Sequence, residues 1–402
     1  MRGQRDKVPH APWPMVRLGE LGKITRGSGI KRNETVKSGY PCLRYGEIYT
    51  SYNFILDKPR SFVQKEVFDS SVHIKQGDLV FTLTGETEDE IAKTLAYLGD
   101  EEIAAGGDLA VWTDHGCDPK YLAYLMYSPE LIKAKALASN GQIIVHISVK
   151  KFQQIEIPLP PLPVQREIVA RLERELAAVE KMKKGFEALA ETAKAEFKAE
   201  LKEVFEELKS GGAGIGTDGT NGTHGTVETR RLGEVCENLD SRRVPITKSD
   251  REAGKYPYYG ASGIVDWVSG YIFDGDYLLV SEDGANLIAR STPIAFSVSG
   301  KIWVNNHAHI LAFPDLTTQK FVEFYFASIK IDDIVTGAAQ PKLTQNALNS
   351  IAIPVPSLAV QREVVARLDA AKARAEKLEA KAREGVAVCE TMRKAILKEA
   401  FE

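Results

Sequence analysis

An internal duplication constrains this chain more than any other feature of its sequence. Residues 155–172 read IEIPLPPLPVQREIVARL, and residues 351–368 read IAIPVPSLAVQREVVARL. Most positions are identical, and most of the others exchange one apolar residue for another. A weaker echo lies upstream, where the Arg-Leu-Gly-Glu of 17–20 returns at 231–234. A repeat of this kind predicts two copies of one structural unit, each a globular part followed by a helix.

Each copy ends in a segment with the pattern of a long amphipathic helix. After the prolines of 158–163, apolar residues recur every three or four positions from Ile168 to Phe205, and again from Val364 to Ile396. This spacing places them in one stripe along each helix. Helices of about 40–45 residues are roughly 60–67 Å long, so each stripe needs a partner of similar length. An antiparallel pair of the two helices meets that need; the alternative is that each helix packs elsewhere or dimerises with another chain.

The globular parts have the pattern of mixed domains. Short β-like runs such as Asp78–Leu83 lie between Gly-rich turns, and helical stretches are expected at 119–138 and 320–335. We therefore predict an α+β fold class: two α/β domains separated by a long antiparallel two-helix coiled-coil spacer, as a pseudo-two-fold tandem repeat. The predicted segments are a first domain at 1–157, a first helical spacer at 158–209, a flexible Gly- and Thr-rich linker at 210–226, a second domain at 227–353 and a second helical spacer at 354–402.

The overall charge argues against a protein that binds nucleic acid through a uniformly positive surface. The 402 residues include 52 Lys and Arg against 55 Asp and Glu, a formal net charge of −3. The four cysteines form no C-x-x-C pair, so the sequence has neither a zinc knuckle nor a redox motif. No apolar leader opens the sequence, and no apolar run approaches about 18 residues. We expect a reduced, cytoplasmic protein without a membrane segment.

Positive charge is concentrated in one segment of each copy, directly after the Arg-Leu-Gly-Glu motif. Lys and Arg on loops with glycines and tyrosines suit contacts with phosphates, and Arg can also read guanine edges. One such segment alone is more often an ordinary solvated surface, but equivalent segments in two diverged copies favour DNA binding. The candidates are Lys23, Arg26, Lys31, Arg32, Lys37, Arg44 and Tyr45 in the first copy, and Arg242, Arg243, Lys248, Arg251 and Tyr259 in the second.

Polar residues in glycine-containing loops add candidates for contacts with base edges. Asn can pair with adenine, and Asp can accept a hydrogen bond from cytosine. These candidates are Thr84 and Thr87 in the first copy, and Ser281, Asp283 and Asn286 in the second.

The sequence does not favour catalysis. His307 and His309 alternate on a predicted strand and could ligate a metal from one side, but the sequence marks no third ligand. It contains no Asn-Pro-Pro-Tyr-type motif of adenine methyltransferases, no G-x-x-x-x-G-K-[ST] phosphate loop and no G-x-S-x-G elbow. The pattern is that of a binding protein.

The repeated segment, Ile-Glu-Ile-Pro-Leu-Pro-Pro-Leu-x-x-Gln-Arg-Glu-Ile-Val followed by a long helix, resembles the specificity subunit of type I restriction–modification systems. The Arg-Leu-Gly-Glu opening is similar to that family's pattern, and so is Thr-Gly-x-x-Gln-Pro-x-Leu at Thr336–Leu343. This second motif adds Gln340 and Lys342 to the candidates for DNA contacts. The first copy departs from it, with Asn140-Gly141-Gln142 and no Gln-Pro-x-Leu. The resemblance covers essentially the whole chain.

The resemblance implies two target recognition domains that each read one half of a bipartite, asymmetric DNA site. It implies as partners double-stranded DNA, two DNA adenine-N6 methyltransferase subunits and restriction/translocase subunits. S-adenosylmethionine, ATP and Mg would belong to those partners, and this chain would be a non-catalytic subunit with no cofactor or metal. Two competing hypotheses are a coiled-coil scaffold or anti-restriction decoy that binds methyltransferase subunits without reading DNA, and a metal-dependent hydrolase that uses His307 and His309.

Overall fold

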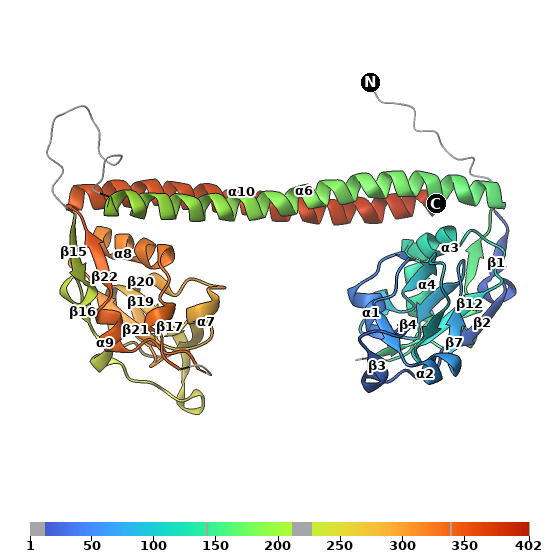
Figure 1. The fold of residues 1–402 in the computed structure, drawn as a ribbon, viewed down its shortest axis with the longest axis horizontal. Helices are drawn as coiled ribbons and strands as arrows, with labels where there is room; N and C mark the ends of the chain where they lie inside the picture. The colour runs from blue at the N-terminus through green and yellow to red at the C-terminus, as the bar shows by residue number, and fades with distance from the viewer. Residues whose placement is uncertain (1–12, 142–143, 211–226, 338–339, 402) are drawn as a thin grey trace, which may run out of the picture. The chain divides into compact units, whose positions relative to one another are not determined.

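The computed structural model describes residues 13–141, 144–210, 227–337 and 340–401. The chain divides into two compact units, the first made of Met1–Phe186 with Glu384–Glu402 and the second of Glu187–Arg383. Each unit holds one mixed domain and parts of the same two long helices (Figure 1). Apart from Ser210, the linker predicted at 210–226 lies outside the described residues.

The first domain contains two five-stranded sheets. Their strands are β2 (Lys23–Arg26), β3 (Thr35–Val36), β4 (Tyr40–Leu43), β5 (Ile55–Leu56), β6 (Ser61–Val63), β7 (Val72–Ile74), β8 (Leu79–Thr82), β10 (Thr94–Tyr97), β11 (Ile103–Ala105) and β12 (Leu109–Thr113). The orders are β2-β12-β8-β10-β5 and β3-β6-β4-β11-β7. Leu79, Phe81 and Trp112 are fully buried in the core of the first sheet.

The helices of the first domain are short. They are the 3₁₀ helices η1 (Leu18–Glu20), η2 (Arg32–Glu34) and η3 (Glu88–Glu90), and the α-helices α1 (Tyr45–Thr50), α2 (Lys65–Asp69), α3 (Pro119–Leu125), α4 (Pro129–Ala138) and α5 (Val149–Phe152). The prediction of one helix at 119–138 was wrong, because Pro129 cannot continue α3 and instead opens α4. The Ser128 hydroxyl accepts a hydrogen bond from the Leu131 amide and caps the new helix.

The second domain has one six-stranded sheet. Its strands are β16 (Glu237–Asn238), β17 (Ala253–Gly260), β18 (Gly263–Val268), β19 (Phe273–Ser281), β20 (Ala295–Val304) and β21 (Ala308–Ala312), in the order β16-β21-β19-β20-β17-β18. Its helices are η4 (Leu232–Glu234), η5 (Asp240–Arg242), η6 (Lys248–Asp250), α7 (Asn286–Ala289), α8 (Leu316–Ser328), η7 (Asp332–Ile334) and α9 (Gln345–Asn349). The helix expected at 320–335 begins earlier, after the Asp315 cap, and ends at Ser328.

The repeated motifs join each domain to its long helix in the same way. Strand β1 (Met15–Arg17) pairs antiparallel with β14 (Glu156–Pro158), and β15 (Glu228–Arg231) pairs antiparallel with β22 (Ala352–Val355). The buried leucine of each Arg-Leu-Gly-Glu donates its amide to the residue before the last strand, Leu18 to Ile155 and Leu232 to Ile351, both at 2.9 Å. The motif therefore belongs to the scaffold of the domain.

The glutamine of each Gln-Arg-Glu also has a structural role. Gln165 and Gln361 are almost fully buried, and each side-chain amide donates to a proline carbonyl, that of Pro160 at 2.8 Å or Pro356 at 2.9 Å. A buried amide that fixes the last turn before a helix explains why this residue is identical in the two copies.

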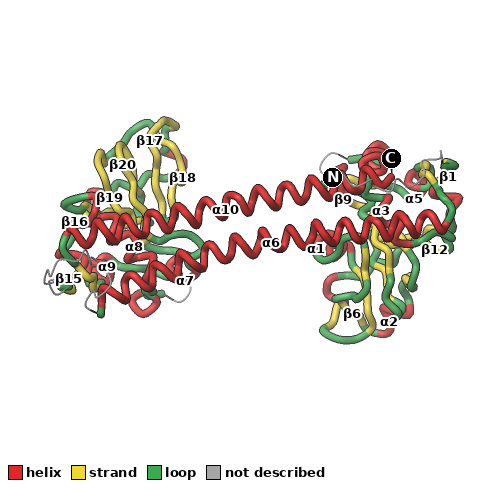
Figure 2. Tube along the Cα trace, turned by 90° about the horizontal axis from the view of Figure 1, so that it is seen from above, coloured by secondary structure: helices red, strands yellow, loops and turns green. Residues whose placement is uncertain are grey.

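The two long helices, α6 (Leu162–Lys209) and α10 (Leu358–Phe401), run antiparallel within each unit (Figures 1 and 2). In the first unit, Lys183 pairs with Glu390 at 2.6 Å, and the Phe186 ring lies where a side chain at Gly385 would stand. In the second unit, Arg367 contacts Glu207 at 3.3 Å and Glu200 at 3.2 Å, and further along α10 Arg374 contacts Glu200 at 3.0 Å.

The predicted α+β tandem repeat with antiparallel helices is therefore confirmed. Among the residues that the structure describes, no helix combines the length and the apolar character that crossing a membrane requires.

Candidate nucleic-acid interface

In the second domain, two of the predicted loops lie against each other. Thr336 and Lys342 exchange backbone hydrogen bonds of 2.9 and 2.7 Å and close the loop between them, and Lys342 also forms a β-bridge with Asp283. Gly337 has φ +87°, and a Cβ there would stand 2.5 Å from the Gln340 carbonyl oxygen. We call residues 283–286 with 336, 337 and 340–342 loop site 2.

The first domain closes its loops in the same way. Asn140 and His146 exchange backbone hydrogen bonds of 2.9 and 2.8 Å. Gly141 has φ +124°. His146 belongs to β13 (Val145–His146) and pairs with Thr84 of β9 (Thr84–Gly85). We call residues 84–87 with 140–146, as far as described, loop site 1. The two sites have equivalent backbones although the first lacks the Gln-Pro-x-Leu motif.

The equivalence extends to single residues. The Ile147 amide donates to the Leu83 carbonyl at 3.0 Å, and the Leu343 amide donates to the Glu282 carbonyl at 2.7 Å. Counting onward from these pairs, Thr84 corresponds to Asp283. Thr87 likewise corresponds to Asn286, so the candidates chosen from both copies occupy matching positions.

Loop site 1 is supported from beneath by a tyrosine. The Tyr49 hydroxyl lies 2.9 Å from both the Thr82 hydroxyl and the Thr84 carbonyl oxygen, and burial raises the pKa of this phenol. The ring of Tyr45, one turn earlier on α1, lies 5.2 Å from that of Tyr49. The predicted candidate Tyr45 is thus placed next to loop site 1.

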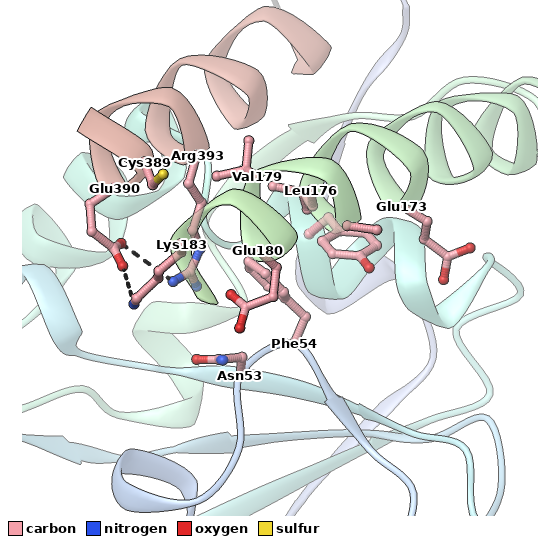
Figure 3. A pocket seen from close by; sticks show the side chains of 12 residues that line it. Asn53, Phe54, Glu173, Leu176, Val179, Glu180, Lys183, Cys389, Glu390 and Arg393 are labelled. Atoms are coloured by element: carbon pink, nitrogen blue, oxygen red, sulfur yellow. Dashed lines mark hydrogen bonds and ion pairs between the residues drawn. The ribbon is translucent and has the colours of Figure 1, made fainter. Parts of the chain in front are cut away.

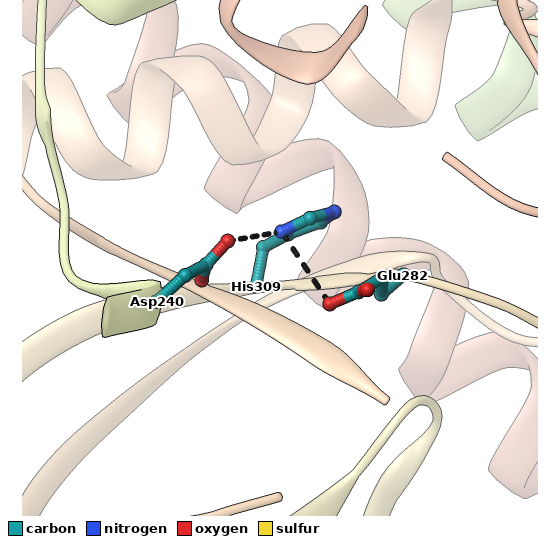
Figure 4. Close-up of side chains that lie close together, drawn as sticks. All are labelled: Asp240, Glu282 and His309. Atoms are coloured by element: carbon teal, nitrogen blue, oxygen red, sulfur yellow. Dashed lines mark hydrogen bonds and ion pairs between the residues drawn. The ribbon is translucent and has the colours of Figure 1, made fainter. Parts of the chain in front are cut away.

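Loop site 2 rests instead on charged groups (Figure 4). His309 Nδ1 lies 2.5 Å from an Asp240 oxygen, and its Nε2 lies 2.8 Å from the Leu343 carbonyl oxygen. Glu282 accepts from Arg243 at 2.7 Å and pairs with Lys342 at 3.1 Å. These five side chains, of Asp240, Arg243, Glu282, His309 and Lys342, are called the charge network.

The His309 ring bridges two oxygen atoms, one of the Asp240 carboxyl group and the other of the Leu343 carbonyl. Burial alone would raise the pKa of Asp240, but the hydrogen bond and charge of His309 outweigh it, and the pKa lies below its usual value. For Glu282, burial is likewise outweighed by Arg243, His309 and Lys342, and its pKa is also lowered.

Asp240, Glu282 and His309 have the residue types of a metal site, and their candidate ligand atoms lie within 4.8 Å of one another. The positive charge that a metal would supply is already provided by Arg243 and Lys342. His307 contacts a different carboxylate, Asp283, at 2.8 Å. The two histidines therefore do not converge, and the geometry does not support the hydrolase hypothesis.

The remaining candidates of the first domain are arranged around β2 and α1. Arg26 donates through Nε to the Gly107 carbonyl at 3.0 Å; the adjacent Asp108 carbonyl accepts the Leu83 amide, so Arg26 lies close to loop site 1. Arg44 precedes α1, where its amide donates to Glu47. Four candidates have exposed side chains: Lys23 on β2, Lys31 just before η2, Arg32 in η2 and Lys37 after β3.

The remaining candidates of the second domain divide into held and exposed groups. Arg243 belongs to the charge network, and Arg251 is held by Asp266 at 3.2 Å and by the ring of Tyr258. Ser281 is fully buried, and burial raises the pKa of Tyr259. The candidates with exposed side chains are Arg242, Lys248, Gln340 and Lys342.

Sequence reasoning missed Tyr49 and His146, and in the charge network it missed Asp240 and Glu282. One signal was present: the spacing that aligns Gln165 with Gln361 also aligns His146 with Lys342. No sequence signal connects Asp240 with His309, because their contact depends on β16 and β21 being neighbours in the sheet.

The first unit also contains a cavity of about 500 Å³ between α6, α10 and the loop at Asn53 and Phe54 (Figure 3). The Lys183–Glu390 ion pair forms part of its wall, and the Arg393 guanidinium lies 4.8 Å from the centre of the Phe54 ring. Its lining consists of groups that attach the helices to the domain, and we assign it no ligand.

Comparison with known proteins gives a family match over most of the chain. A family model described as the type I restriction modification DNA specificity domain matches residues 11–186 and again residues 224–386. The two matches correspond to the two copies of the repeat.

Individual relatives agree with this match. A type I restriction enzyme specificity subunit of Methanocaldococcus jannaschii, MjaVIII, is 24% identical over 90% of this chain and 86% of its own length. A candidate type I specificity subunit of Haemophilus influenzae, S.HindORF215P, is 37% identical over 144 residues, which cover 36% of this chain and 37% of that protein. A solved structure from work on the assembly and conformational transition of a type I restriction–modification system is similar in fold, with a TM-score of 0.73, 18% identity and 99% of each chain covered.

Proposed function

This chain belongs to the type I restriction–modification DNA specificity family, and from that premise we propose that it reads a bipartite, asymmetric DNA site and positions its partner enzymes on it. Each domain reads one half-site through its loop site. Two adenine-N6 methyltransferase subunits and a restriction/translocase subunit assemble with the chain. S-adenosylmethionine, ATP and Mg belong to those partners, and this chain itself is non-catalytic.

The observation that carries the proposal is the pair of equivalent loop sites with different side chains. Thr84 and His146 stand in one site where Asp283 and Lys342 stand in the other. Base edges in the major groove differ in their donors and acceptors, so different side chains on one backbone select different bases. A tandem repeat with two diverged sites fits a DNA target with two different halves.

The proposal leaves chemistry to the partners. An adenine inside a duplex must leave the base stack before its N6 atom can be methylated, and the pocket that receives it belongs to the methyltransferase. The role of this chain is to choose which adenine is presented.

A matched pair of variants tests the proposal. Thr87→Ala and Asn286→Ala change equivalent positions, and long-read methylation mapping in cells that express the complete complex shows the bases recognised in each half. We expect each variant to relax a different half-site, because a good side-chain contact to a base is worth about 1–3 kcal/mol of discrimination. Changes confined to one and the same half, or no bipartite methylated motif with the wild-type chain, would contradict the proposal; the second result would favour the scaffold hypothesis.

A further inference from the structure

The hairpin β17–β18 of the second domain carries apolar side chains that the fold does not bury. Ile264 is 47% exposed, Val265 55% and Trp267 50%. Strand β18 is the edge of its sheet (Figure 2). The register pairs Ile264 with Tyr259 and Trp267 with Pro257, which places Ile264 and Trp267 on one face of the hairpin. We call Ile264 and Trp267 the apolar hairpin surface.

The tip of this hairpin is attached to loop site 2. The Ser281 hydroxyl, at the end of β19, donates to the Ala261 carbonyl in the hairpin turn. On the other side of the turn, the Asn305 amide donates to the Tyr259 carbonyl at 3.0 Å, and the Asn305 side chain accepts from the His307 amide at 2.8 Å. His307 in turn contacts Asp283. The turn of the hairpin is therefore linked to the polar groups of loop site 2.

We infer that the apolar hairpin surface is a further DNA-contacting element of the second domain, which packs against thymine methyl groups in the major groove. This inference rests on the proposed function and extends it. The major groove admits a two-stranded β-ribbon, and the thymine methyl is the apolar group that base pairs display there. A polar loop can form hydrogen bonds with base edges, and an apolar ribbon beside it can contact thymine methyl groups in the same half-site.

The charges around the hairpin are balanced, because exposed Asp250 and Glu252 lie between Lys248 and Lys255 in the sequence. Asp266 is the one acidic residue in the sequence of β18, GIVDWV, and Arg251 neutralises it at 3.2 Å. Exposed Lys248 and Lys255 lie on η6 and β17, where they can meet phosphates on either side of the groove. A free, apolar sheet edge can also add a strand from a protein partner, and the test below separates that occupant from DNA.

The test removes apolar groups from both sides of the contact. On the protein side, the variant is Ile264→Ser with Trp267→Ser, and the control is Leu316→Ser, a residue 54% exposed at the start of α8 in the same domain. On the DNA side, uracil replaces thymine in the half-site that the second domain reads. Binding is measured with the complete complex and duplexes of the mapped sequence.

For the wild type and the control, we expect each contacted thymine that becomes uracil to weaken binding about fourfold, the value of one buried methyl group. The double variant should bind thymine DNA roughly ten- to fifty-fold more weakly and should not distinguish uracil from thymine. Equal binding and equal uracil sensitivity in variant and wild type would overturn the inference alone. Loss of the methyltransferase subunits from the purified variant complex would overturn it in favour of a protein contact. A wild-type complex without preference for any bipartite site would instead refute the proposed function.

Discussion

Loop sites 1 and 2 have the same backbone closure but different support beneath it. In the first, the Tyr49 hydroxyl holds the strand that enters the loop, and Leu83 is a buried apolar residue. In the second, the residue equivalent to Leu83 is Glu282, which binds Arg243 and Lys342. One site is fixed by an uncharged hydroxyl and the other by a set of paired charges.

The register makes the contrast sharper. Val280 pairs with His309 and Phe81 pairs with Ala110, so Ala110 is the counterpart of the buried His309. Both sites keep a glycine with positive φ directly after the first residue of the loop closure, Gly141 after Asn140 and Gly337 after Thr336, and both keep the mutual backbone hydrogen bonds. The backbone closure is therefore the element that the two sites share, and the residues beneath it can change polarity completely.

The largest loss of stability is expected when His309 of the second domain is replaced by alanine, the residue at the equivalent position, Ala110, in the first domain. His309→Ala removes a side chain that is 1% exposed and leaves Asp240 buried without its main partner, which costs about 3–5 kcal/mol. The free energy of unfolding of the second unit should fall by this amount in urea titrations followed by Trp303 fluorescence. Adding Asp240→Ala should restore part of the loss. A cost below about 1 kcal/mol would show that the charge network does not hold loop site 2.

Acid should lower the free energy of unfolding of the second unit in the same direction as His309→Ala, by protonating Asp240. The folded-state pKa of Asp240 is lowered, so its contribution is complete above the usual carboxyl pKa of about 4 and is lost as pH falls through the lower folded value. The wild-type second unit should therefore lose stability below about pH 4 more steeply than Asp240→Asn.

The first domain also buries an ionisable side chain, but this one is basic: it is the side chain of Lys135. Lys135 is 2% exposed and donates to the Ala92 carbonyl at 3.2 Å, and burial lowers its pKa to about 7. The unfolded chain binds a proton between about pH 7 and pH 10 that the folded one does not, so stability of the first unit should rise by a few kcal/mol across that range. Lys135→Met should remove this rise.

The pH dependence of the stability of the first unit is measured by hydrogen exchange of α4 and β10 amides, corrected for the intrinsic rate at each pH. Lys133→Met is the matched control, because it removes an exposed lysine from the same helix. A Lys135→Met variant with the pH dependence of the wild type would rule out Lys135 as the source.

The sequence predicted the scaffold well because the scaffold is where the two copies remain alike. The duplicated prolines, Gln165 with Gln361, and Leu18 with Leu232 all make the same buried contacts in both copies. Local patterns were less informative inside the domains, where Pro129 divided a predicted helix.

The candidate site was predicted only in part. Thr84, Thr87, Asp283 and Asn286 were selected because they lie in polar, glycine-containing loops, and the structure places them at matching positions. Arg243 was selected by its charge alone, and a sequence pattern cannot distinguish a guanidinium free for phosphate from one that binds Glu282 across 39 residues of chain. That distinction depends on which strands are neighbours in the sheet.

The glycines of the two closures offer an intermediate test of their equivalence. Gly141→Ala and Gly337→Ala should each cost about 1–3 kcal/mol locally, because positive φ is unfavourable for other residues and the new Cβ would lie 2.1 Å from the Ile144 oxygen or 2.5 Å from the Gln340 oxygen. Each should weaken recognition of one half-site only, measured on duplexes in which one half is randomised. Gly185→Ala, in open space on α6, is the control.

Similar losses from both substitutions would support equivalence. A loss from Gly337→Ala with none from Gly141→Ala would show that loop site 1 does not use this closure to bind DNA.

The smallest expected effect separates an exposed arginine from a held one. Arg26 has a side chain that is 67% exposed and lies 3.6 Å from Asp108, so it can turn toward a phosphate. Arg26→Ala should reduce the slope of log K against log salt by about 0.9, the value of one lost phosphate contact. Arg17→Ala changes a residue on β1 whose side chain is 55% exposed and pairs with Glu156, and it should leave the slope unchanged. Arg243→Ala should also leave the slope unchanged but should lower stability, because Glu282 loses its 2.7 Å partner. If Arg243→Ala reduces the slope as much as Arg26→Ala does, the charge network opens when DNA binds, and the contrast between the two loop sites applies only to the free protein.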